Sequence, residues 1–453
     1  MRFSILCCLA VLSLLSLENA HAAISAQERA GLIALYNSTG GSAWTHNTNW
    51  NGAAGTECTW YGVTCDATST HVSAIALSSN HMVGPFPAST FNPGASAHLA
   101  FVTSFDVGNN QLSGALPSFA SASNLTSLYL GVNQFTGSIA ALQGPASLKT
   151  MFIGGNQLTG PIQTLAGMPN IQIFSTNNNP VTGSLPSLSG NQHLISFQCS
   201  QCQLTGTIPA FSNVPNLREY YVSQNSLSGS IPALDGAPSL QSIYLENNGL
   251  SGPIPALTGL PNLTQFSASY NQLSGSLPDL TGLTQLQGFQ VRLNRLTGTI
   301  PSLAGLSNLY TFDVQSNLLN GALPALGEFG NLHYFTAGSN QFSGPLPSLA
   351  GLTFLSLFDV SNSQLTGPIP SLAGLTGLNF FSVGGNRLTG PAPALPTPTN
   401  ALYGGYSTLC PNLLDLTASA NDAGWNAATG FTPWWSEHGS QCDILLRNGF
   451  EAN

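Results

Sequence analysis

Charged side chains are scarce in this sequence. Asp, Glu, Lys and Arg make up 6% of its 453 residues, against roughly 25% in an ordinary soluble domain. The net charge is −9, and Lys and Arg together number only 8. A nucleic-acid partner requires a basic surface, so the composition argues against one. The polar surface must instead consist of Ser, Thr, Asn and Gln, which leaves few general acids or bases.

Long hydrophobic runs are also missing, except at the start of the chain. Arg2 precedes an apolar run over 5–17, and the small-x-small stretch Ala-His-Ala follows at 20–22. This order is typical of a secretory signal peptide. The alternative, a membrane anchor, is disfavoured because the run is shorter than the roughly 20 residues that span a bilayer. We therefore expect a secreted or cell-surface protein whose mature chain has no transmembrane segment.

Recognisable catalytic and metal-binding motifs are missing as well. The sequence contains neither an H-E-x-x-H nor a G-x-S-x-G motif, and its 8 His residues are scattered. We therefore expect no enzyme activity, no cofactor and no metal ion.

The sequence is instead dominated by a repeated phrase rich in Gly and Pro. The stretch 364–375, "QLTGPIPSLAGL", has near copies along most of the chain. Alignment on N-x-L-x-G separates Asn110 from Asn386 by 12 steps of 23 residues, and a longer first step of 30 residues leads from Asn80 to Asn110. The 14 units have at this position Asn80, Asn110, Asn133, Asn156, Asn179, Cys202, Asn225, Asn248, Asn271, Asn294, Asn317, Asn340, Ser363 and Asn386.

Each unit predicts a short strand followed by a turn. Apolar residues stand 8, 5 and 3 positions before the Asn, as Leu125, Leu128 and Leu130 do before Asn133, and the last two have the spacing of one strand face. One unit cannot bury this face alone, so stacked units must form a parallel sheet. The Asn side chain would satisfy backbone groups at the turn. The Gly and Pro that follow favour a second short strand or polyproline-like segment, and then a turn of 3₁₀ type.

These repeats, from about Val72 to Pro391, resemble the plant-type leucine-rich repeat, whose consensus places L-x-G-x-I-P after the Asn. The unit is one residue shorter than is usual in that family. The resemblance implies an α/β repeat solenoid: a right-handed leucine-rich-repeat superhelix with a concave parallel β-sheet, about 14 repeats of 23 residues, and a cap at each end.

The two end regions have the features of caps. Ser25 and Glu28 have capping-box spacing at the start of an expected helix that ends near Gly40. The stretch 58–65, "CTWYGVTC", resembles the N-terminal cap of plant-type repeat ectodomains, where C-x-W-x-G-V-x-C closes a disulfide. All six Trp lie in the end regions, and we interpret them as covers for the ends of the stack rather than as a ligand-binding aromatic box.

Six Cys remain after removal of the signal peptide, and they allow 15 full pairings. We predict the pairs Cys58–Cys65 and Cys410–Cys442, as befits an oxidising compartment. Cys199 is at a core position and Cys202 at the Asn position. Three residues of strand span roughly 10 Å, more than the ~7 Å between Cα atoms that a disulfide tolerates. We therefore expect two buried thiols here rather than a redox pair.

The expected organisation has five parts: a signal peptide (1–22), an N-terminal cap (23–71), the leucine-rich-repeat solenoid (72–390), a Pro-rich transition (391–409), and a C-terminal cap and tail (410–453). The "NGFE" in the tail resembles endings of secreted proteins from some Gram-negative bacteria.

Binding residues would lie on the outward-facing columns of the expected sheet. Because charges are so few, a cluster of them beside two Tyr stands out: Glu219, Tyr221, Tyr244, Glu246, Arg292 and Arg295. Tyr and Arg are favoured anchors of interfaces, so these six form a candidate ligand-binding patch. The alternative is an ordinary polar sheet surface. Asp313 and Asp359 also share an outward column, two repeats and so roughly 10 Å apart, just beyond the carboxylate spacing of an inverting glycosidase.

The expected function is non-catalytic binding of an extracellular protein or peptide, with a glycan as a further possible ligand. Plant receptor ectodomains of this shape bind peptides and proteins, which suggests the class of partner. A structural or adhesive envelope protein that binds wall polysaccharide is the alternative. A carbohydrate hydrolase that uses Asp313 and Asp359 is the least favoured.

Overall fold

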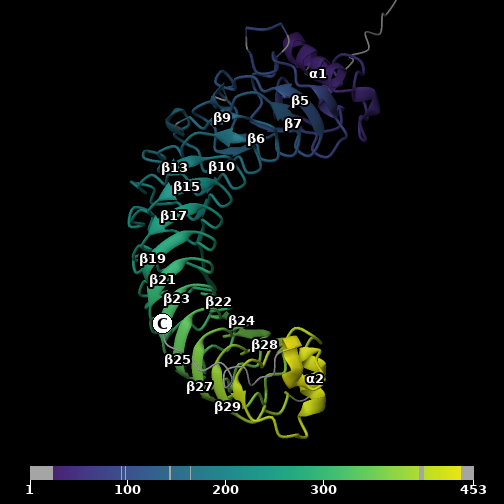
Figure 1. The fold of residues 1–453 in the computed structure, drawn as a ribbon. Helices are drawn as coiled ribbons and strands as arrows, with labels where there is room; N and C mark the ends of the chain where they lie inside the picture. The colour runs from purple at the N-terminus through teal and green to yellow at the C-terminus, as the bar shows by residue number, and fades with distance from the viewer. Residues whose placement is uncertain are drawn as a thin grey trace, which may run out of the picture.

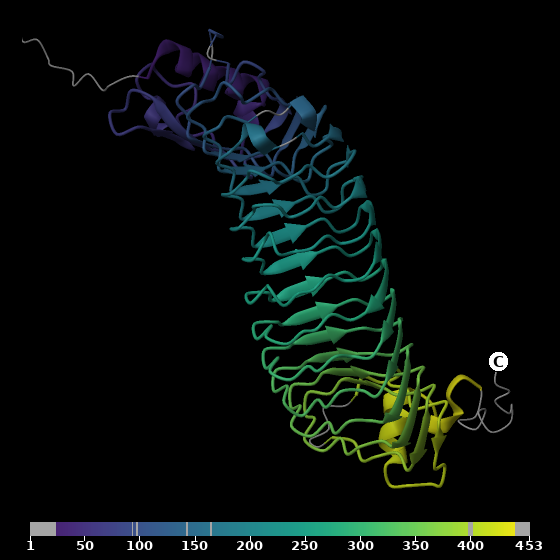
Figure 2. The ribbon, with the colours of Figure 1, turned by 90° about the vertical axis from the view of Figure 1, so that its left-hand side faces the viewer.

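The computed structural model describes residues 24–92, 94–96, 98–141, 144–163, 165–396 and 402–439. The predicted signal peptide, Cys442 and the NGFE ending lie outside these residues. Figure 1 shows one solenoid bent into an arc, with helix α1 (Ala26–Ser38) at one end and helix α2 (Asp422–Thr429) at the other. Figure 2 shows its strands stacked like rungs along the arc.

A 15-stranded sheet lines the concave side of the arc (Figure 1). Its pairing is parallel except between the first two strands. From β2 onward there is one strand for each of the 14 predicted units, which confirms the repeat alignment. In spatial order the strands are β1 (Val63–Cys65), β2 (Val72–Ala76), β4 (Ser104–Asp106), β6 (Ser127–Tyr129), β8 (Thr150–Phe152), β10 (Ile173–Ser175), β12 (Ser196–Gln198), β14 (Glu219–Tyr221), β16 (Ser242–Tyr244), β18 (Gln265–Ser267), β20 (Gly288–Gln290), β22 (Thr311–Asp313), β24 (Tyr334–Thr336), β26 (Leu357–Asp359) and β28 (Phe380–Ser382).

Shorter sheets run along the opposite side of the solenoid. A second strand thus forms as predicted, but in the repeats it ends at the Gly or within one residue of it rather than following it. A 10-stranded sheet there consists of β13 (Thr205–Thr207), β15 (Ser226–Gly229), β17 (Gly249–Gly252), β19 (Gln272–Ser276), β21 (Arg295–Gly298), β23 (Leu318–Gly321), β25 (Gln341–Pro345), β27 (Gln364–Pro368), β29 (Arg387–Gly390) and β30 (Leu413–Leu414). Nearer the N-terminus are β3 (Val83–Pro85), β5 (Gln111–Ala115) and β7 (Gln134–Thr136), and the pair β9 (Gly160–Pro161) and β11 (Val181–Thr182). Among the described repeats, a 3₁₀ turn forms only at η3 (Ile139–Ala141) and η4 (Leu165–Gly167).

The core lies between the two sides and is built column by column. From β4 onward the central residue of each concave strand points inward, and in the C-terminal half that residue is Phe on six successive rungs. Neighbouring rings of this column stack with centroids 5.5–5.8 Å apart. We call this set the Phe column; its members are Phe266, Phe289, Phe312, Phe335, Phe358 and Phe381.

The repeated Asn forms a ladder, as predicted. Asn340 is typical: its Nδ2 donates to the carbonyl oxygens of Val314 and Ala337, both at 3.0 Å. The ladder continues to Asn412, whose Nδ2 donates to the Val383 carbonyl at 2.8 Å. Asn412 follows Asn386 by 26 residues rather than 23, so the spacing rule does not predict this further turn.

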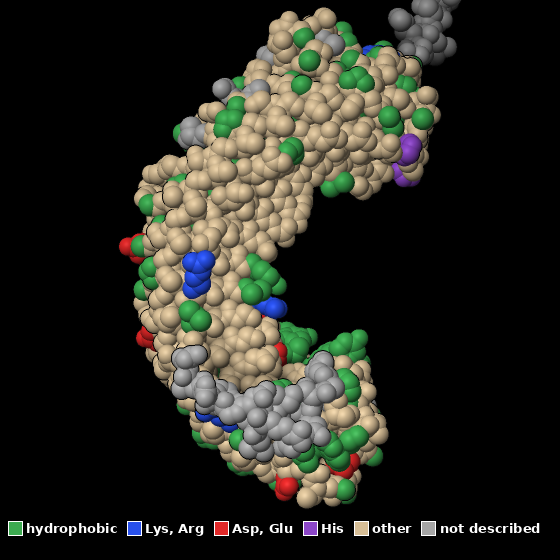
Figure 3. Space-filling view, viewed as in Figure 1, with side chains coloured by type: hydrophobic (Ala, Val, Ile, Leu, Met, Phe, Trp, Pro, Cys, Tyr) green, Lys and Arg blue, Asp and Glu red, His purple; other side chains and the backbone are tan. Residues whose placement is uncertain are grey.

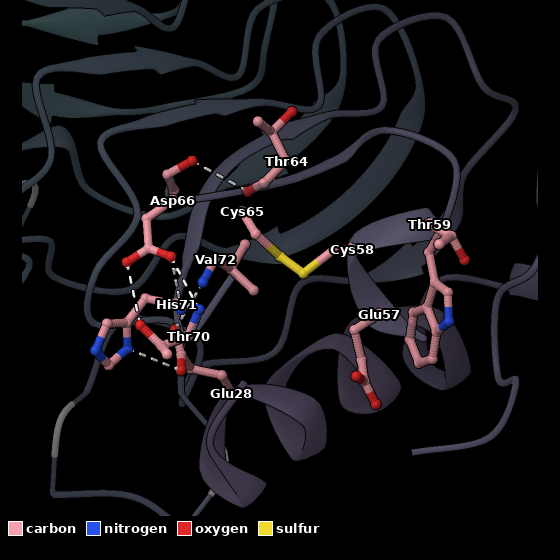
Figure 4. Close-up of a disulfide and its surroundings, with 12 residues drawn as sticks. Glu28, Glu57, Cys58, Thr59, Thr64, Cys65, Asp66, Thr70, His71 and Val72 are labelled. Carbon is pink, nitrogen blue, oxygen red and sulfur yellow. Dashed lines mark hydrogen bonds and ion pairs between the residues drawn. A yellow bond between two sulfur atoms is a disulfide. The ribbon is translucent and has the colours of Figure 1, made fainter. Parts of the chain in front are cut away.

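The N-terminal cap joins helix α1 to the first repeat. Ser25 and Glu28 form the predicted capping box. Glu28 is fully buried, and it accepts a hydrogen bond from the Val72 backbone amide at 2.9 Å. Its other oxygen lies 3.2 Å from Nδ1 of His71 (Figure 4). Because Val72 opens β2, this carboxylate fastens the capping helix to the concave sheet.

The predicted disulfide Cys58–Cys65 is present and links η2 (Glu57–Thr59) to β1 (Figure 4). The 3₁₀ segment η1 (Gly41–Ala43) and the buried rings of Trp44, Trp50 and Trp60 complete this cap. At the other end, Trp425 and Trp434 are buried around α2 and η5 (Trp434–Gly439). The interpretation of these Trp as end covers is thus confirmed for the five buried rings. The pair Cys410–Cys442 stays a prediction, because Cys442 is not among the described residues.

The expectation of two buried thiols at Cys199 and Cys202 agrees with the structure, but the wide separation on which it was based does not. Both side chains are buried, as predicted, but their Sγ atoms lie only 2.6 Å apart. The chain does not run extended between them, because Gln201 adopts a left-handed backbone conformation with φ of 54°. This turn brings together two side chains that a continuous strand would separate.

Within the described ranges, no helix combines the length and the apolar character that crossing a membrane would require.

Candidate functional site

Four of the six predicted ligand-binding residues lie together on two neighbouring strands of the concave sheet. Glu219 and Tyr221 are the first and last residues of β14, and Tyr244 ends β16. Tyr221 and Tyr244 are register partners, with ring centroids 4.9 Å apart in an edge-to-face arrangement. Glu246 follows two residues after Tyr244, on the same outward-facing side. Alternate residues of a strand point to the same face, so the carboxylates of Glu219 and Glu246 lie on either side of the Tyr221–Tyr244 pair along the strands.

The Glu219 carboxylate is held by the preceding strand. Its Oε2 accepts a hydrogen bond from the Ser196 hydroxyl at 2.8 Å and another from the Gln198 amide at 3.4 Å, and both donors belong to β12. The carboxylate is therefore positioned before any ligand arrives.

Burial dominates the titration of the other groups in this cluster. It raises the pKa of the Glu246 carboxyl, whose Oε2 is buried with no hydrogen-bond partner among the described residues. Burial also raises the pKa of both Tyr hydroxyls, with smaller contributions from the charges of Glu219 at Tyr221 and of Glu246 at Tyr244. Glu246 is thus a partly desolvated carboxylate with unused hydrogen-bonding capacity.

Arg292 supplies the opposite charge farther along the same face. It follows β20, and its guanidinium carbon lies 5.6 Å from the centre of the Tyr270 ring. Its Nε is buried and has no hydrogen-bond partner within the described part of the chain. The concave face therefore holds an incompletely satisfied cation as well as an incompletely satisfied anion.

Arg295 does not belong to this group, and its predicted placement on the same face is wrong. It opens β21 in the opposite sheet and is exposed there. The cause is local: the chain turns at Asn294 and leaves the concave sheet between the two Arg residues. We call the remaining five residues the concave patch: Glu219, Tyr221, Tyr244, Glu246 and Arg292.

The two carboxylates considered for a hydrolase are engaged within the protein. Asp359 accepts hydrogen bonds from the Ser361 amide and hydroxyl at 2.9 and 2.7 Å, and from the Gln315 side chain at 3.0 Å. Burial raises the pKa of Asp313, and this shift is opposed by the Gln315 backbone amide, which donates to its Oδ1 at 3.1 Å, and by the nearby Arg292 charge. Among the described residues, no group of three or more His, Cys, Asp or Glu is arranged to hold a metal ion.

A second surface was missed in the sequence. Aromatic side chains gather on the C-terminal arm, at the edge where the concave strands begin, and Figure 3 shows hydrophobic side chains on this arm facing the opening of the arc. We call this surface the aromatic ledge; it consists of Tyr310, His333, Tyr334, Phe354, Phe380, Tyr403 and Tyr406.

Ring contacts and sheet register connect the ledge across five turns. Tyr310, His333 and Phe354 form a stack, with successive centroids 4.1 and 5.6 Å apart. Phe380 contacts both Tyr403 and Tyr406, at 5.2 and 5.9 Å. Tyr406, the most exposed member, leaves 66% of its surface to solvent. The signal in the sequence was the set of aromatic residues 6, 7 and 9 positions before the Asn.

Two family models match parts of the chain. The leucine rich repeat N-terminal domain matches residues 25–66, and the leucine rich repeat itself matches residues 239–260. A comparison with curated protein sequences gives no match.

Solved structures of leucine-rich-repeat ectodomains match the chain more extensively. A TDR receptor is 28% identical, with a TM-score of 0.66, over 76% of this chain and 62% of the receptor chain. The plant peptide hormone receptor RGFR1, solved in complex with RGF2, is 26% identical with a TM-score of 0.64, over 74% of this chain and 65% of that one. This chain thus covers less than two thirds of either receptor chain. InlJ from Listeria monocytogenes shares the fold at 18% identity and a TM-score of 0.57, over 75% of this chain and 68% of its own.

The matched cap, the Asn ladder and the parallel concave sheet agree with one another. The chain thus contains a leucine rich repeat N-terminal domain and a leucine rich repeat, and its solenoid is similar to those of the TDR receptor and of the plant peptide hormone receptor RGFR1.

Proposed function

We propose that this protein is a non-catalytic binding protein, secreted or displayed at the cell surface, which recognises a protein or peptide ligand through the concave patch. The observation that carries the proposal is the pair of buried atoms there, Glu246 Oε2 and Arg292 Nε, which have no hydrogen-bond partner among the described residues. Buried polar atoms without partners are uncommon in folded proteins. Both atoms are covered by the protein itself, so each side chain must turn outward before a ligand can supply a donor to Glu246 and an acceptor to Arg292 and so recover the lost hydrogen bonds.

A polypeptide is the ligand class that suits this arrangement. Its backbone and side chains supply donors and acceptors at short intervals, and Tyr221 and Tyr244 offer the amphipathic ring surface that is favoured at protein interfaces. The complex of RGFR1 with RGF2 shows a similar solenoid with a ligand. Extracellular placement is supported by the Cys58–Cys65 disulfide and by the signal-like residues 1–22, which we propose are removed.

A peptide-display selection on the immobilised mature chain tests this function. Enriched peptides should bind Arg292→Ala and Tyr244→Ala at least tenfold more weakly than the wild type. Arg295→Ala is the matched control, because it removes the same side chain three residues away on the other sheet, and its binding should be unchanged. If the enriched peptides bind all three variants as they bind the wild type, the concave patch is not the recognition surface.

The aromatic ledge favours a second candidate function, the binding of neutral polysaccharide in a cell envelope. The ledge contains no Asp, Glu, Lys or Arg, and its rings lie beside neutral hydrogen-bonding groups such as Ser356 and Asn379. Rings with neutral polar neighbours suit the apolar faces and hydroxyls of sugars. Exposed apolar patches of this kind mark interaction sites.

A panel of neutral polysaccharides, assayed by affinity electrophoresis, distinguishes this function from the first. Retardation that is lost in Phe354→Ala and Tyr403→Ala, but kept in Tyr61→Ala at the N-terminal cap, would support glycan binding at the ledge. Migration that is the same with and without polysaccharide would exclude it.

A further inference from the structure

Cys199 and Cys202 occupy a single turn of the solenoid next to the concave patch. Cys199 directly follows β12, and Cys202 occupies the position that Asn fills in the turns on either side. Their relative exposures are 0% and 8%. The pair is therefore buried in the core. It lies at the end of β12, the strand that pairs with β14 and so with the strand of Glu219.

The two sulfur atoms are too close to be independent thiols. Their separation of 2.6 Å is shorter than the contact distance of non-bonded sulfur atoms, and it approaches the covalent separation of about 2.0 Å. The left-handed backbone of Gln201 aims the two side chains at one another. No movement of other parts of the chain is needed to bring them together.

Cys202 Sγ lies 3.6 and 3.7 Å from the carbonyl oxygens of Thr176 and Ser200, within the range of weak S–H···O hydrogen bonds. In the next turn, the Asn225 amide donates to the Cys199 and Val222 carbonyl oxygens at 2.7 and 3.0 Å. A thiol is a weak single donor, so Cys202 replaces the Asn amide only in part, and a further link to the end of its strand would strengthen this turn.

We propose that Cys199 and Cys202 form a disulfide, which at this turn replaces the Asn side chain as the link between the strand end and the turn. The reaction is an exchange with an external disulfide such as oxidised glutathione. A bond forms between the two Sγ atoms, and the disulfide bond of the oxidant breaks. The two thiol protons and two electrons leave in two molecules of reduced glutathione.

Burial also determines when this bond can form and break. It raises the pKa of the Cys199 thiol, and exchange requires a thiolate that the oxidant can reach. Oxidation therefore takes place before the turn closes, during folding. In the folded protein, the same burial shields the disulfide from reductants. The disulfide does not depend on which ligand the concave patch binds.

Mass spectrometry of the full mature chain tests the proposal directly. The chain is refolded in a glutathione redox buffer, unfolded in guanidinium without reductant, alkylated and digested with trypsin. The tryptic peptide from Thr150 to Arg218 contains Cys199 and Cys202 and no other cysteine. It should carry no alkyl group and weigh two hydrogens less than the dithiol form. Two alkyl groups on this peptide, or a link to another peptide, would overturn the proposal, and so would a metal ion bound by the two thiols.

The double variant Cys199→Val with Cys202→Asn is the matched control, because other turns have Val and Asn at these positions. Wild type and variant are each refolded with and without reductant, and their urea midpoints are compared. The midpoint of the wild type should drop further in reductant than that of the variant, which keeps Cys58 and Cys65. Equal drops would show that Cys199 and Cys202 make no bond.

Discussion

The backbone amide of Leu319 donates a hydrogen bond of 3.0 Å to the side-chain oxygen of Asn340, one turn farther along the chain. The same bond joins Leu296 to Asn317 and Leu365 to Asn386. Each Asn therefore fastens its own turn to the preceding one, and a turn without Asn lacks that connection. Ser363 is such a turn, and its buried hydroxyl has no hydrogen-bond partner among the described residues.

Restoring the ladder at this turn should stabilise the protein. Ser363→Asn supplies the missing amide, so we expect the free energy of unfolding to rise by about 1–2 kcal/mol, measured by urea denaturation. Ser363→Ala is the control, because it removes an unpartnered hydroxyl and should change stability little. An Asn variant no more stable than the Ala variant would contradict the account of the ladder.

The carboxylate of Glu28 should be required for docking of the N-terminal cap. Glu28→Ala leaves the buried Val72 amide without its acceptor, and we expect a loss of about 1–3 kcal/mol. Thermal unfolding followed by circular dichroism measures the loss. Ser25→Ala, which removes the helix cap but keeps the Glu28–Val72 bond, should cost only about 1 kcal/mol. Equal effects of the two changes would mean that the bond to Val72 contributes nothing.

Two glycines at equivalent positions of neighbouring repeats should respond in opposite ways to the same substitution. A Cβ at Gly236 would collide with the carbonyl oxygen of Phe211, whereas a Cβ at Gly259 meets no atom within 4 Å. We expect Gly236→Ala to destabilise the protein by about 1–3 kcal/mol, and Gly259→Ala to be neutral or to stabilise it by up to about 1 kcal/mol. The free energies of unfolding of both variants, measured by chemical denaturation, test this prediction. Equal values would contradict it.

The concave patch should lower the stability of the protein at neutral pH. Burial raises the pKa of Glu246 above its ordinary value of 4.5, so at pH values between the two the folded state binds more protons than the unfolded state. Stability therefore falls as pH rises through this window, and the penalty is complete above the raised pKa. Glu246→Gln should be more stable than the wild type at pH 7, and the difference should disappear toward about pH 4.

Asp279 supplies the control for this pH dependence. It is exposed, and hydrogen bonds from Thr281 lower the pKa of its carboxyl. The ionised carboxylate of Asp279 therefore stabilises the folded state, in contrast to that of Glu246. Asp279→Asn should bring no gain in stability at neutral pH. Urea midpoints measured from pH 4 to pH 8 would compare the variants, and a wild type as stable as Glu246→Gln at pH 7 would contradict the burial argument.

The repeat explains why so much of the fold could be predicted. The apolar positions around Asn133, the capping box at Ser25 and the cap disulfide at Cys58 each depend on fixed spacings within a short stretch of chain. The apolar and Asn positions also recur every 23 residues, so a unit with an unusual residue, such as Cys202, can be aligned from its neighbours. Strand existence, ladder and caps were accordingly predicted from the sequence alone.

The features that sequence reasoning missed depend on where the backbone turns. Arg295 is three residues from Arg292, but the bend at Asn294 sends it to the other sheet. The contact between Cys199 and Cys202 depends on the left-handed conformation of Gln201. The aromatic ledge combines three columns of five turns, and two of its members, Tyr403 and Tyr406, lie beyond the 23-residue spacing.

The Phe column has a mechanical consequence. Within the column each ring stacks on the rings of adjacent turns, so force applied to the two ends of the chain would reach the turns one after another. Pulled in an optical trap, the solenoid should lengthen in a sawtooth, each tooth releasing one unit of about 80 Å of extended chain. Under load the solenoid would therefore yield one turn at a time rather than all at once.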